Sequence, residues 1–243
     1  MDELQLFRGK DYKLNDKITI HHPTLNEICD YGEQKYYSMV SNLCATPSDF
    51  KVQLLDNFGI DYEEVSDFEM FSMISRSLTV EDTSIILGEL DFKFFILAEN
   101  TQTNELVLYD KQNDIVIDKA IYLLMVEYLR SIHGFERRVD KAGNEHTKKY
   151  LINRERRQLQ RQKNKKYTSM LVPLVSAMVN CEQFKYNHST VWNLPVYVFM
   201  DSVKRIQKLK NYNQLMQGLY AGTIDSKTLS EDSLNWMGSL SKN

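Results

Sequence analysis

The pair His21-His22 is the place in this sequence where two histidines, the commonest metal ligands, stand side by side. The pair belongs to KITIHHP at residues 17–23, whose alternation predicts a short strand that ends at Pro23, because proline donates no ladder hydrogen bond. Neighbouring residues on a strand point to opposite faces, so His21 and His22 cannot both reach one ion unaided. We therefore expect no metal site at this pair.

The other residues that could do chemistry stand apart from one another. Histidines near helix ends usually cap the helix or lie on the surface, and three in this chain are solitary: His133, His146 and His188. The carboxylate pairs Glu63-Glu64 and Glu81-Asp82 fall at predicted helix starts, where the helix dipole accounts for them. The chain contains no GxSxG, Walker A, GxGxxG or HExxH motif. We expect no catalytic residue, no metal, no cofactor and no enzyme activity.

The cysteines and the hydropathy pattern indicate a compartment. Cys29, Cys44 and Cys181 are odd in number, far apart and outside any CxxC spacing, which argues against a disulfide framework and against a zinc site. A reducing cytosol is the expected compartment. The N-terminus lacks an apolar signal region, and the most apolar stretch, at 121–129, is far shorter than the roughly 20 residues that a bilayer requires. We expect neither export nor a membrane partner.

Charge is distributed very unevenly along the chain. Residues 136–166 hold twelve Lys or Arg against four Asp or Glu, a net charge of +8, which leaves −11 on the rest of a chain whose net charge is −3. The most basic part is NRERRQLQRQKNKK at residues 153–166, which contains neither Gly nor Pro and predicts a helix. The sequence therefore describes an acidic body with one basic segment.

The basic segment has several interpretations. If residues 145–166 are helical, the basic side chains spread around most of the helix rather than forming a single stripe, and Tyr150, Leu151, Ile152 and Leu159 are the only apolar anchors. A solvated or docked connector is the first interpretation, and protein–protein docking in an assembly is the second. The alternative is nonspecific contact with nucleic acid, because no helix-turn-helix, zipper or finger accompanies the segment. The candidate interaction residues are Lys148, Lys149, Arg154, Arg156, Arg157, Arg161, Lys163, Lys165 and Lys166.

The N-terminal half predicts many short helices. The first sixteen residues are polar and are expected to be irregular. Residues 24–88 predict a cluster of helices that each begin at a capping residue, and the first of them is expected to run to Leu43. The four helix starts are Thr24, Thr46, Ser66 and Thr79.

The pattern then changes to that of a small sheet. Residues 92–98, 105–110 and 114–118 are rich in β-branched and aromatic residues and are separated by turn residues, which predicts a three-stranded antiparallel meander. Asp118 is a cap for a helix that ends at Gly134, is apolar on most sides and is expected to be buried. The fold class expected is α+β, mainly α-helical.

The C-terminal half is expected to be helical. A polar linker at 139–149 leads into the basic helix, and helices are predicted at 169–180, 188–193 and 194–220. Short capped turns follow, and we expect the segment 223–239 to fold back or to dock on a neighbour through Leu229, Leu234 and Trp236. The predicted domains are residues 1–138, helical with the β-meander, 139–166, the basic linker helix, and 167–243, a helical region.

Several stretches together resemble a known family. The chain is similar over nearly its whole length to proteins encoded in the structural modules of phages and prophages of Firmicutes, and more distantly to tail assembly chaperones and baseplate-hub assembly proteins. The stretches that carry the resemblance are IHHPTLNEICDYGEQKYYSMVSNL, GIDYEEVSDFEMF, LGELDF, LYDKQNDIVID, YLINRERRQLQRQKNKK, VNCEQFKYNHSTVWNLPVYVF and GLYAGTIDSKTLSEDSLNWM.

The resemblance implies a role in phage tail morphogenesis. The protein is then expected to be a tail-associated structural subunit of the virion or a tail assembly chaperone, which acts in the host cytoplasm during assembly. The expected partners are other phage structural proteins of the tail tube, tape measure or baseplate, with a second copy of this chain as a further partner. The alternative function is that of a nucleic-acid-binding phage protein that uses the basic helix 148–166.

Overall fold

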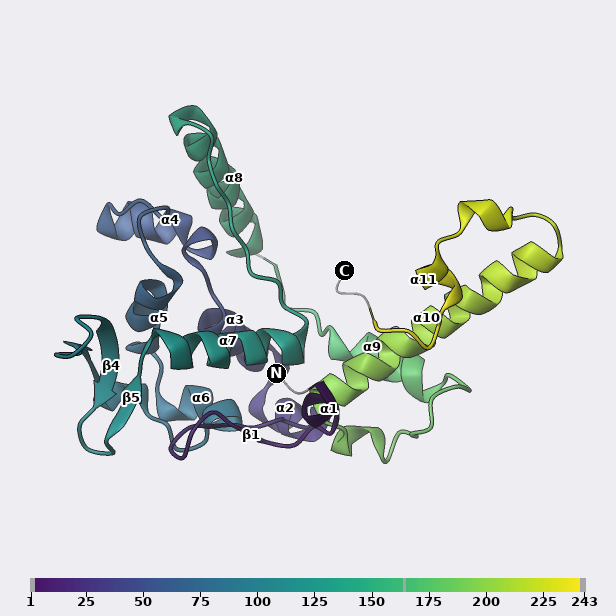
Figure 1. Ribbon diagram of the computed structural model, residues 1–243, viewed down its shortest axis with the longest axis horizontal. Coiled ribbons are helices and arrows are strands. Elements are labelled where there is room, and N and C mark those ends of the chain that lie inside the picture. Colours follow the sequence, from purple (N-terminus) through teal and green to yellow (C-terminus); the bar gives the residue numbers. More distant parts are fainter. Residues whose placement is uncertain (1–2, 164, 241–243) are drawn as a thin grey trace.

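The computed structural model describes residues 3–163 and 165–240 and confirms an α+β protein that is mainly helical. Figure 1 shows a body with one helix across its centre. A second helix rises from this body, and one long helix extends sideways from it. The α-helices are α1 (Glu3–Phe7), α2 (Leu25–Tyr31), α3 (Glu33–Leu43), α4 (Lys51–Gln53), α5 (Asp67–Ser75), α6 (Val80–Leu87), α7 (Lys119–His133), α8 (Glu145–Lys163), α9 (Leu171–Val179), α10 (Val196–Tyr220) and α11 (Glu231–Leu234). The strands are β1 (Tyr12–Lys13), β2 (Thr19–Ile20), β3 (Phe95–Glu99), β4 (Leu106–Asp110) and β5 (Ile115–Ile117).

The N-terminal segment is more ordered than its polar composition predicts. It forms α1 and then β1, which pairs antiparallel with β2. The expectation of an irregular start was wrong because tertiary contacts order the segment: Leu6 is buried in the core. Gly9, with φ of +60°, lies so close to Pro195 that a Cβ there would approach the proline Cγ to 2.6 Å. The chain start is thereby packed on the beginning of α10.

The helix starts in residues 24–88 are confirmed. Thr24 and Ser66 each accept a hydrogen bond from the backbone N–H three residues on, and the glutamates at those positions bond back, so both form complete capping boxes. The expected continuous helix to Leu43 was wrong, because Gly32, with φ of +98°, separates α2 from α3. After a 3₁₀ turn (Pro47–Asp49), α4 continues into a π-helical turn (Leu54–Phe58) that ends at the left-handed Gly59.

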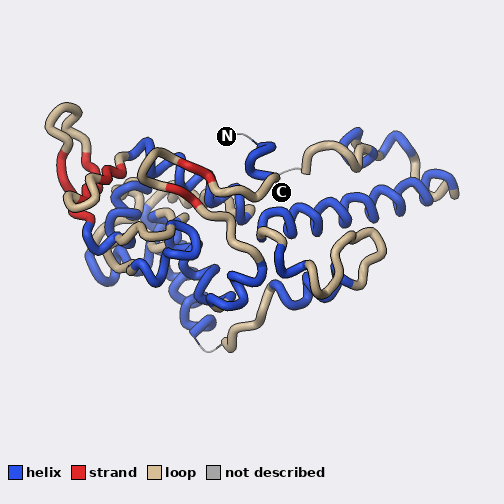
Figure 2. The backbone as a smooth tube through the Cα atoms, turned by 90° about the horizontal axis from the view of Figure 1, so that it is seen from below, coloured by secondary structure: helices blue, strands red, loops and turns tan. Residues whose placement is uncertain are grey.

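The three-stranded meander is also confirmed. Its order is β3-β4-β5, with Phe95 opposite Asp110 and Asp110 opposite Ile115. Residues Phe92–Phe94 form a 3₁₀ turn instead of the first part of the strand. In Figure 2 this sheet lies at the end of the molecule opposite to the tip of α10.

The central helix α7 organises the core. Asp118 caps it through Ile121 N (2.8 Å), and Gly134 ends it in the left-handed conformation, both as predicted. Its buried side chains include Met125 and Leu129, but Leu124 is 50% exposed, so only one face is covered. The expectation that the whole helix is buried was therefore wrong: Leu123 and Leu124 are both exposed to solvent.

One core joins the N-terminal and C-terminal parts of the chain. Buried side chains from Leu6 to Phe199 belong to a single apolar cluster that includes residues of α2, α3, α7, α9 and α10. Backbone bonds reinforce it: Leu25 N donates to Leu194 O (3.0 Å) and Val196 N donates to Pro23 O (2.9 Å).

The domain boundaries remain a prediction. Within the described part of the chain, no helix combines the length and apolar character that crossing a bilayer requires.

Two histidines are built into this core with tyrosine partners. His22 Nε2 lies 2.7 Å from the Tyr128 hydroxyl, and the other nitrogen of its buried ring has no hydrogen-bond partner among the described residues. His133 Nδ1 lies 2.7 Å from Leu129 O and its Nε2 lies 2.5 Å from the Tyr36 hydroxyl. His133 thus bonds a carbonyl in the last turn of its own helix, as a capping residue does, and it also contacts Tyr36. Burial lowers the pKa of both histidines to about 4.

These two histidines predict a defined pH dependence of stability. Both remain neutral in the folded state down to about pH 4, whereas in the unfolded chain they bind protons below about pH 6.5. The free energy of unfolding is thus expected to fall with decreasing pH between about 6.5 and 5, by about 1.4 kcal/mol per pH unit for each fully protonated unfolded histidine. Urea unfolding at several pH values measures this slope.

Single variants assign the slope. His22→Asn and His133→Asn should each remove part of it, whereas Gln102→Asn, which changes no titratable group at an exposed position, should leave it unchanged. A slope that is the same in all three variants as in the parent protein would contradict the assignment.

Candidate interaction site

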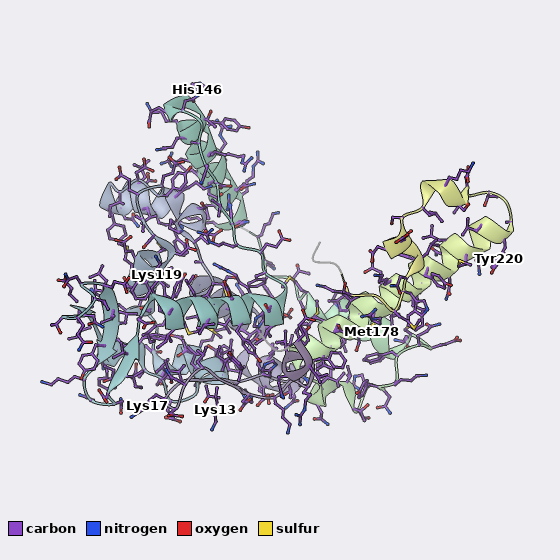
Figure 3. The ribbon with its side chains drawn as sticks, viewed as in Figure 1. Lys13, Lys17, Lys119, His146, Met178 and Tyr220 are labelled. Carbon is purple, nitrogen blue, oxygen red and sulfur yellow. The ribbon has the colours of Figure 1, made fainter. Side chains whose placement is uncertain are left out.

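The basic segment folds as α8, a 19-residue helix that rises from the body. Figure 3 shows His146 at the outer end of this helix. The Asn144 side chain accepts a hydrogen bond from Thr147 N (2.8 Å) at the start of the helix. The expected helix to residue 166 is too long: α8 ends at Lys163, and Lys165 and Lys166 lie in the chain that returns to the body.

The return of the chain explains the end of α8. Glu33, at the start of α3, accepts hydrogen bonds from Met170 N (2.8 Å) and Leu171 N (2.9 Å). Burial of the Glu33 carboxyl disfavours its charge, but these hydrogen bonds and those from Ser169 and Tyr167 outweigh that effect and lower its pKa. The segment after α8 is thus tied to the body at a charged helix start.

One narrow face of α8 packs against the body. Ile152 is buried and Leu159 is partly buried in a small apolar cluster with Val52, Leu54 and Tyr62. This cluster is separate from the main core and lies between α8 and the α4 region, which are neighbours in Figure 1. The prediction of apolar anchors is correct for Ile152 and Leu159. It was wrong for Tyr150, which is 60% exposed because it lies on the opposite side of the helix.

Two basic residues of α8 pair with carboxylates of the body. Lys148 Nζ lies 2.5 Å from Asp61 Oδ2 and 2.7 Å from Glu63 Oε2, and Arg156 contacts Asp56 at 2.6 Å. The hydrogen bonds with Asp61 and Glu63 raise the pKa of Lys148, and the bond from Lys148 lowers that of Glu63. Part of the +8 segment is therefore neutralised within the same chain.

A cluster of charges holds the middle of α8 to the body, and we call it the root cluster: Lys51, Arg138, Asp49, Asp140 and Glu155. The Lys51 side chain is completely buried and contacts Asp140, with Glu155 at 3.9 Å. Arg138 bridges Asp140 (2.8 Å) and Glu155 (2.9 Å), and Asp49 lies 3.6 Å away. Sequence reasoning missed this cluster, because an isolated lysine near a predicted helix start is normally exposed.

The other face of α8 carries the basic side chains that have no partner. Lys149, Arg154, Arg157, Arg161 and Lys163 are exposed, and within residues 3–163 and 165–240 none of them forms a side-chain hydrogen bond or an ion pair. Tyr150, Arg154, Arg157 and Arg161 are spaced four, three and four residues apart, so they lie on one side of the helix. We call these four residues the arginine row.

The row becomes visible as a pattern only when the basic residues that pair with the body are left out of the comparison. All nine candidate basic residues together do spread around the segment, as the sequence indicates. Pairing of Lys148 and Arg156 with the body leaves the three arginines of the row on the side opposite to Ile152 and Leu159. The only acidic residue between 149 and 166, Glu155, is turned toward Arg138. From Lys149 to Lys163, the charged side chains on the solvent side of α8 are therefore all positive.

The second projecting element is the arm, residues 207–240. It consists of the outer part of α10 and the returning chain with a 3₁₀ turn (Ser226–Thr228) and α11, and Figure 3 shows Tyr220 at its tip. Arg205, at the base of the arm, donates to the carbonyls of Trp236 (2.7 Å) and Gly238 (2.7 Å). Lys208 contacts Asp232 (3.0 Å). These bonds hold the segment 223–239 back along α10.

The arm has no buried residue among those whose burial the structure describes. Its apolar side chains are partly buried at best, and Leu229 and Trp236 are in this class, whereas Leu234 is exposed. Tyr220 is 85% exposed and Met237 is 73% exposed. A two-layer element of this kind covers only one side of each layer, so its apolar surface remains accessible.

The remaining sequence candidates do not converge on one centre. His21 bonds Asp11 (2.7 Å) and Glu27 (3.3 Å) on the surface, whereas His22 points into the core, so the strand geometry separates them as expected. The described residues contain no group of three His, Cys, Asp or Glu arranged to hold a metal ion. Burial raises the pKa of the Cys44 thiol to about 12, which keeps it protonated.

An open acidic hollow lies beside the first hairpin. It has a volume of about 580 Å³, and its acidic lining residues are Asp11, Glu89, Asp91 and Asp110. Burial disfavours the charged form of Asp110, but hydrogen bonds from Asn113 and Gln112 lower its pKa. These hydrogen bonds show that the Asp110 carboxylate stabilises the turn at residues 110–113.

Comparison with known proteins identifies one similar region. Residues 160–241 match the family model described as the YomV second domain. YomV is a protein of the Bacillus prophage SPβ. The match begins in the last turn of α8 and covers α9, α10 and the arm, so the similarity to a prophage protein concerns about a third of the chain. Neither the curated proteins nor the solved structures contained a match to the chain.

The root cluster predicts a large loss of stability when its lysine is replaced. Lys51→Met removes a completely buried cation from between Asp140 and Glu155, leaving the carboxylates to repel each other with Arg138 as their remaining close cation. Breaking a buried ion pair on one side costs about 3 kcal/mol. Urea unfolding should show this decrease. Lys93→Met, at an exposed position, is the matched control, and equal stability of the two variants would contradict the role of Lys51.

The hydrogen bonds of Arg205 predict a local effect in the arm. Arg205→Ala removes both bonds to the carbonyls of Trp236 and Gly238, so amide hydrogen exchange in residues 229–239 should become about tenfold faster. Exchange in α7 should not change, because Arg205 lies outside the main core. Lys210→Ala, an exposed position on the same helix, serves as the control. Unchanged exchange in the arm would show that Arg205 does not hold it.

Proposed function

We propose that this protein acts in phage tail morphogenesis through protein–protein contact, either as a tail-associated subunit of the virion or as an assembly chaperone. Its partners in this proposal are other structural proteins of the tail tube, tape measure or baseplate, and a second copy of the chain is a further partner. The proposal assigns no catalytic step and no cofactor to the chain.

The observation that carries the proposal is the incomplete burial of the arm. The body buries its apolar side chains in the main core and in the small cluster under α8, whereas residues 207–240 bury none of those described. At about 25 cal/mol per Å² of apolar surface removed from water, covering the exposed side of the arm with a partner is favourable. Accessible apolar surface on a projecting element is typical of a site that another protein covers.

The similarity to a prophage domain supports the same proposal. It covers α9, α10 and the arm, and so includes the part of the chain whose apolar surface is incompletely covered. The resemblance of nearly the whole sequence to proteins from phage structural modules points in the same direction. Together they favour assembly of phage particles over a general cellular role.

A deletion tests the arm, and mass spectrometry distinguishes the two forms of the proposal. Removal of the residues from Thr223 onward uncovers the outer part of α10 without touching the main core, so the body should retain its unfolding temperature while particle assembly decreases. Abundant peptides of the intact protein in purified particles are expected for a virion subunit. Their absence from particles, together with recovery of the protein bound to tail proteins from the cell, is expected for a chaperone.

The matched control leaves the arm intact. Lys111→Gln changes an exposed turn of the β-meander, far from the arm in Figure 1, and should leave assembly at the level of the parent protein. Normal assembly with the truncated chain would exclude the residues from Thr223 onward as the partner surface. Normal particle yield in cells that lack the gene altogether would overturn the proposed function.

A further inference from the structure

The two faces of α8 differ in how their charges are used. On the inner face, Lys148 and Arg156 are paired with carboxylates of the body, and Glu155 is held in the root cluster. On the outer face, the arginine row has no ion-pair partner in the described parts of the chain, and Lys149 and Lys163 extend the positive surface on either side of it. Docking of α8 on its own body therefore accounts for the inner charges and leaves the outer ones unexplained.

We propose that the arginine row of α8 binds the sugar-phosphate backbone of a nucleic acid without sequence specificity. Arg154, Arg157 and Arg161 are the primary contacts, and Tyr150 stacks on an unpaired base. This function goes beyond the proposed role in assembly and uses a different surface from the arm. Failure of one proposal therefore leaves the other standing.

The geometry of the row suits a strand of phosphates. Arg154 and Arg161 are separated by seven residues, about 10 Å along a helix that rises 1.5 Å per residue. The fork of an arginine guanidinium donates two parallel hydrogen bonds to a phosphate, which a lysine cannot match. After the helix, Lys165 and Lys166 continue the positive surface in the returning chain. A sugar-phosphate backbone that lies along α8 would thus contact one cationic side chain after another.

The composition of the outer face favours nucleic acid over an acidic protein. Tyr and Arg are also frequent in protein interfaces, but there they normally surround a centre of apolar side chains. The row has only one apolar side chain, Tyr150, which is 60% exposed and is a stacking platform of the kind that single-stranded nucleic acids use. The remaining neighbours on the solvent side, such as Asn153 and Gln160, are polar and exposed. Uniform positive charge with one exposed aromatic ring fits a polyanion with bases.

The test uses the full-length protein and four polyanions. Fluorescence anisotropy measures binding to a labelled single-stranded DNA, a single-stranded RNA and a duplex DNA, each of about 20 nucleotides or base pairs, with polyglutamate of similar length as competitor. We expect binding to the nucleic acids that weakens linearly on a log–log scale with salt, and no comparable displacement by polyglutamate. Stronger binding to single strands than to duplex is expected because Tyr150 can stack only on an unpaired base.

A matched pair of triple variants identifies the surface. Arg154→Gln, Arg157→Gln and Arg161→Gln together should weaken binding at least tenfold at about 0.15 M salt and reduce the salt slope by about two to three. The control combines Lys111→Gln, Lys185→Gln and Lys210→Gln, which are exposed and change the net charge by the same amount. It should bind like the parent protein. Tyr150→Ala should weaken binding to single strands more than to duplex.

Thermal unfolding checks that the variants fold. If the triple variant is unstable, Arg157→Gln alone replaces it in the binding measurement and should lower the salt slope by about one. Three results overturn the proposal: no nucleic-acid binding by the parent protein at about 0.05 M salt, equal weakening in both triple variants, or displacement by polyglutamate as effective as by DNA. The last result, together with salt-sensitive dimers lost in the arginine variant, would assign the row to the acidic hollow of a second copy instead.

Discussion

The buried amino group of Lys51 determines how the charged parts of this protein are arranged. Lysine is rarely buried completely, and a buried cation is tolerated only with close anionic partners. Asp140 and Glu155 supply them, one from the chain that precedes α8 and one from α8 itself. Arg138 balances the additional negative charge by bridging the same two carboxylates. The contact therefore sets the rotation of α8 about its axis, because Glu155 must face the body.

Once Glu155 faces inward, the periodicity of the helix places every other side chain of α8. Ile152 and Leu159 come to lie in the small apolar cluster, and Lys148 and Arg156 reach acidic residues of the body. The arginine row is then directed to solvent. The same arrangement that stabilises the helix on the body thus separates neutralised charges from free ones, and it concentrates the free ones on one surface.

The arm illustrates a different constraint. Its helix begins inside the main core, where Phe199 is fully buried, but the chain beyond Ile206 has too few elements around it to complete a core of its own. Gly218 permits close contact, since a Cβ at that position would approach the Ile224 side chain to 2.5 Å. The returning chain therefore covers one side of the helix and leaves the other side accessible. The molecule carries two exposed surfaces of opposite character, one charged and one apolar.

Local signals in the sequence were reliable wherever the interaction that they report is itself local. The Thr24 and Ser66 capping boxes, the Asp118 cap and the Gly134 stop all involve atoms within a few residues of one another, and each occurs in the structure. The β-meander belongs to the same class, because short turns connect its strands. The predictions failed where distant segments decide the outcome: the ordered N-terminus depends on Pro195, and the chain order gave no sign that His22 meets Tyr128.

The candidate site divides in the same way. The sequence by itself determined that an acidic body carries one strongly basic helix, because net charge and helix propensity are properties of the residues along the chain. Only the tertiary structure decided which of these charges are neutralised, because pairing Lys148 with Asp61 or Arg156 with Asp56 requires residues 87 and 100 positions apart to meet. Such contacts depend on the packing of α8 on the α4 region, which no local pattern specifies. The arginines of the row are among the basic residues that this packing leaves exposed and unpaired within the described parts of the chain.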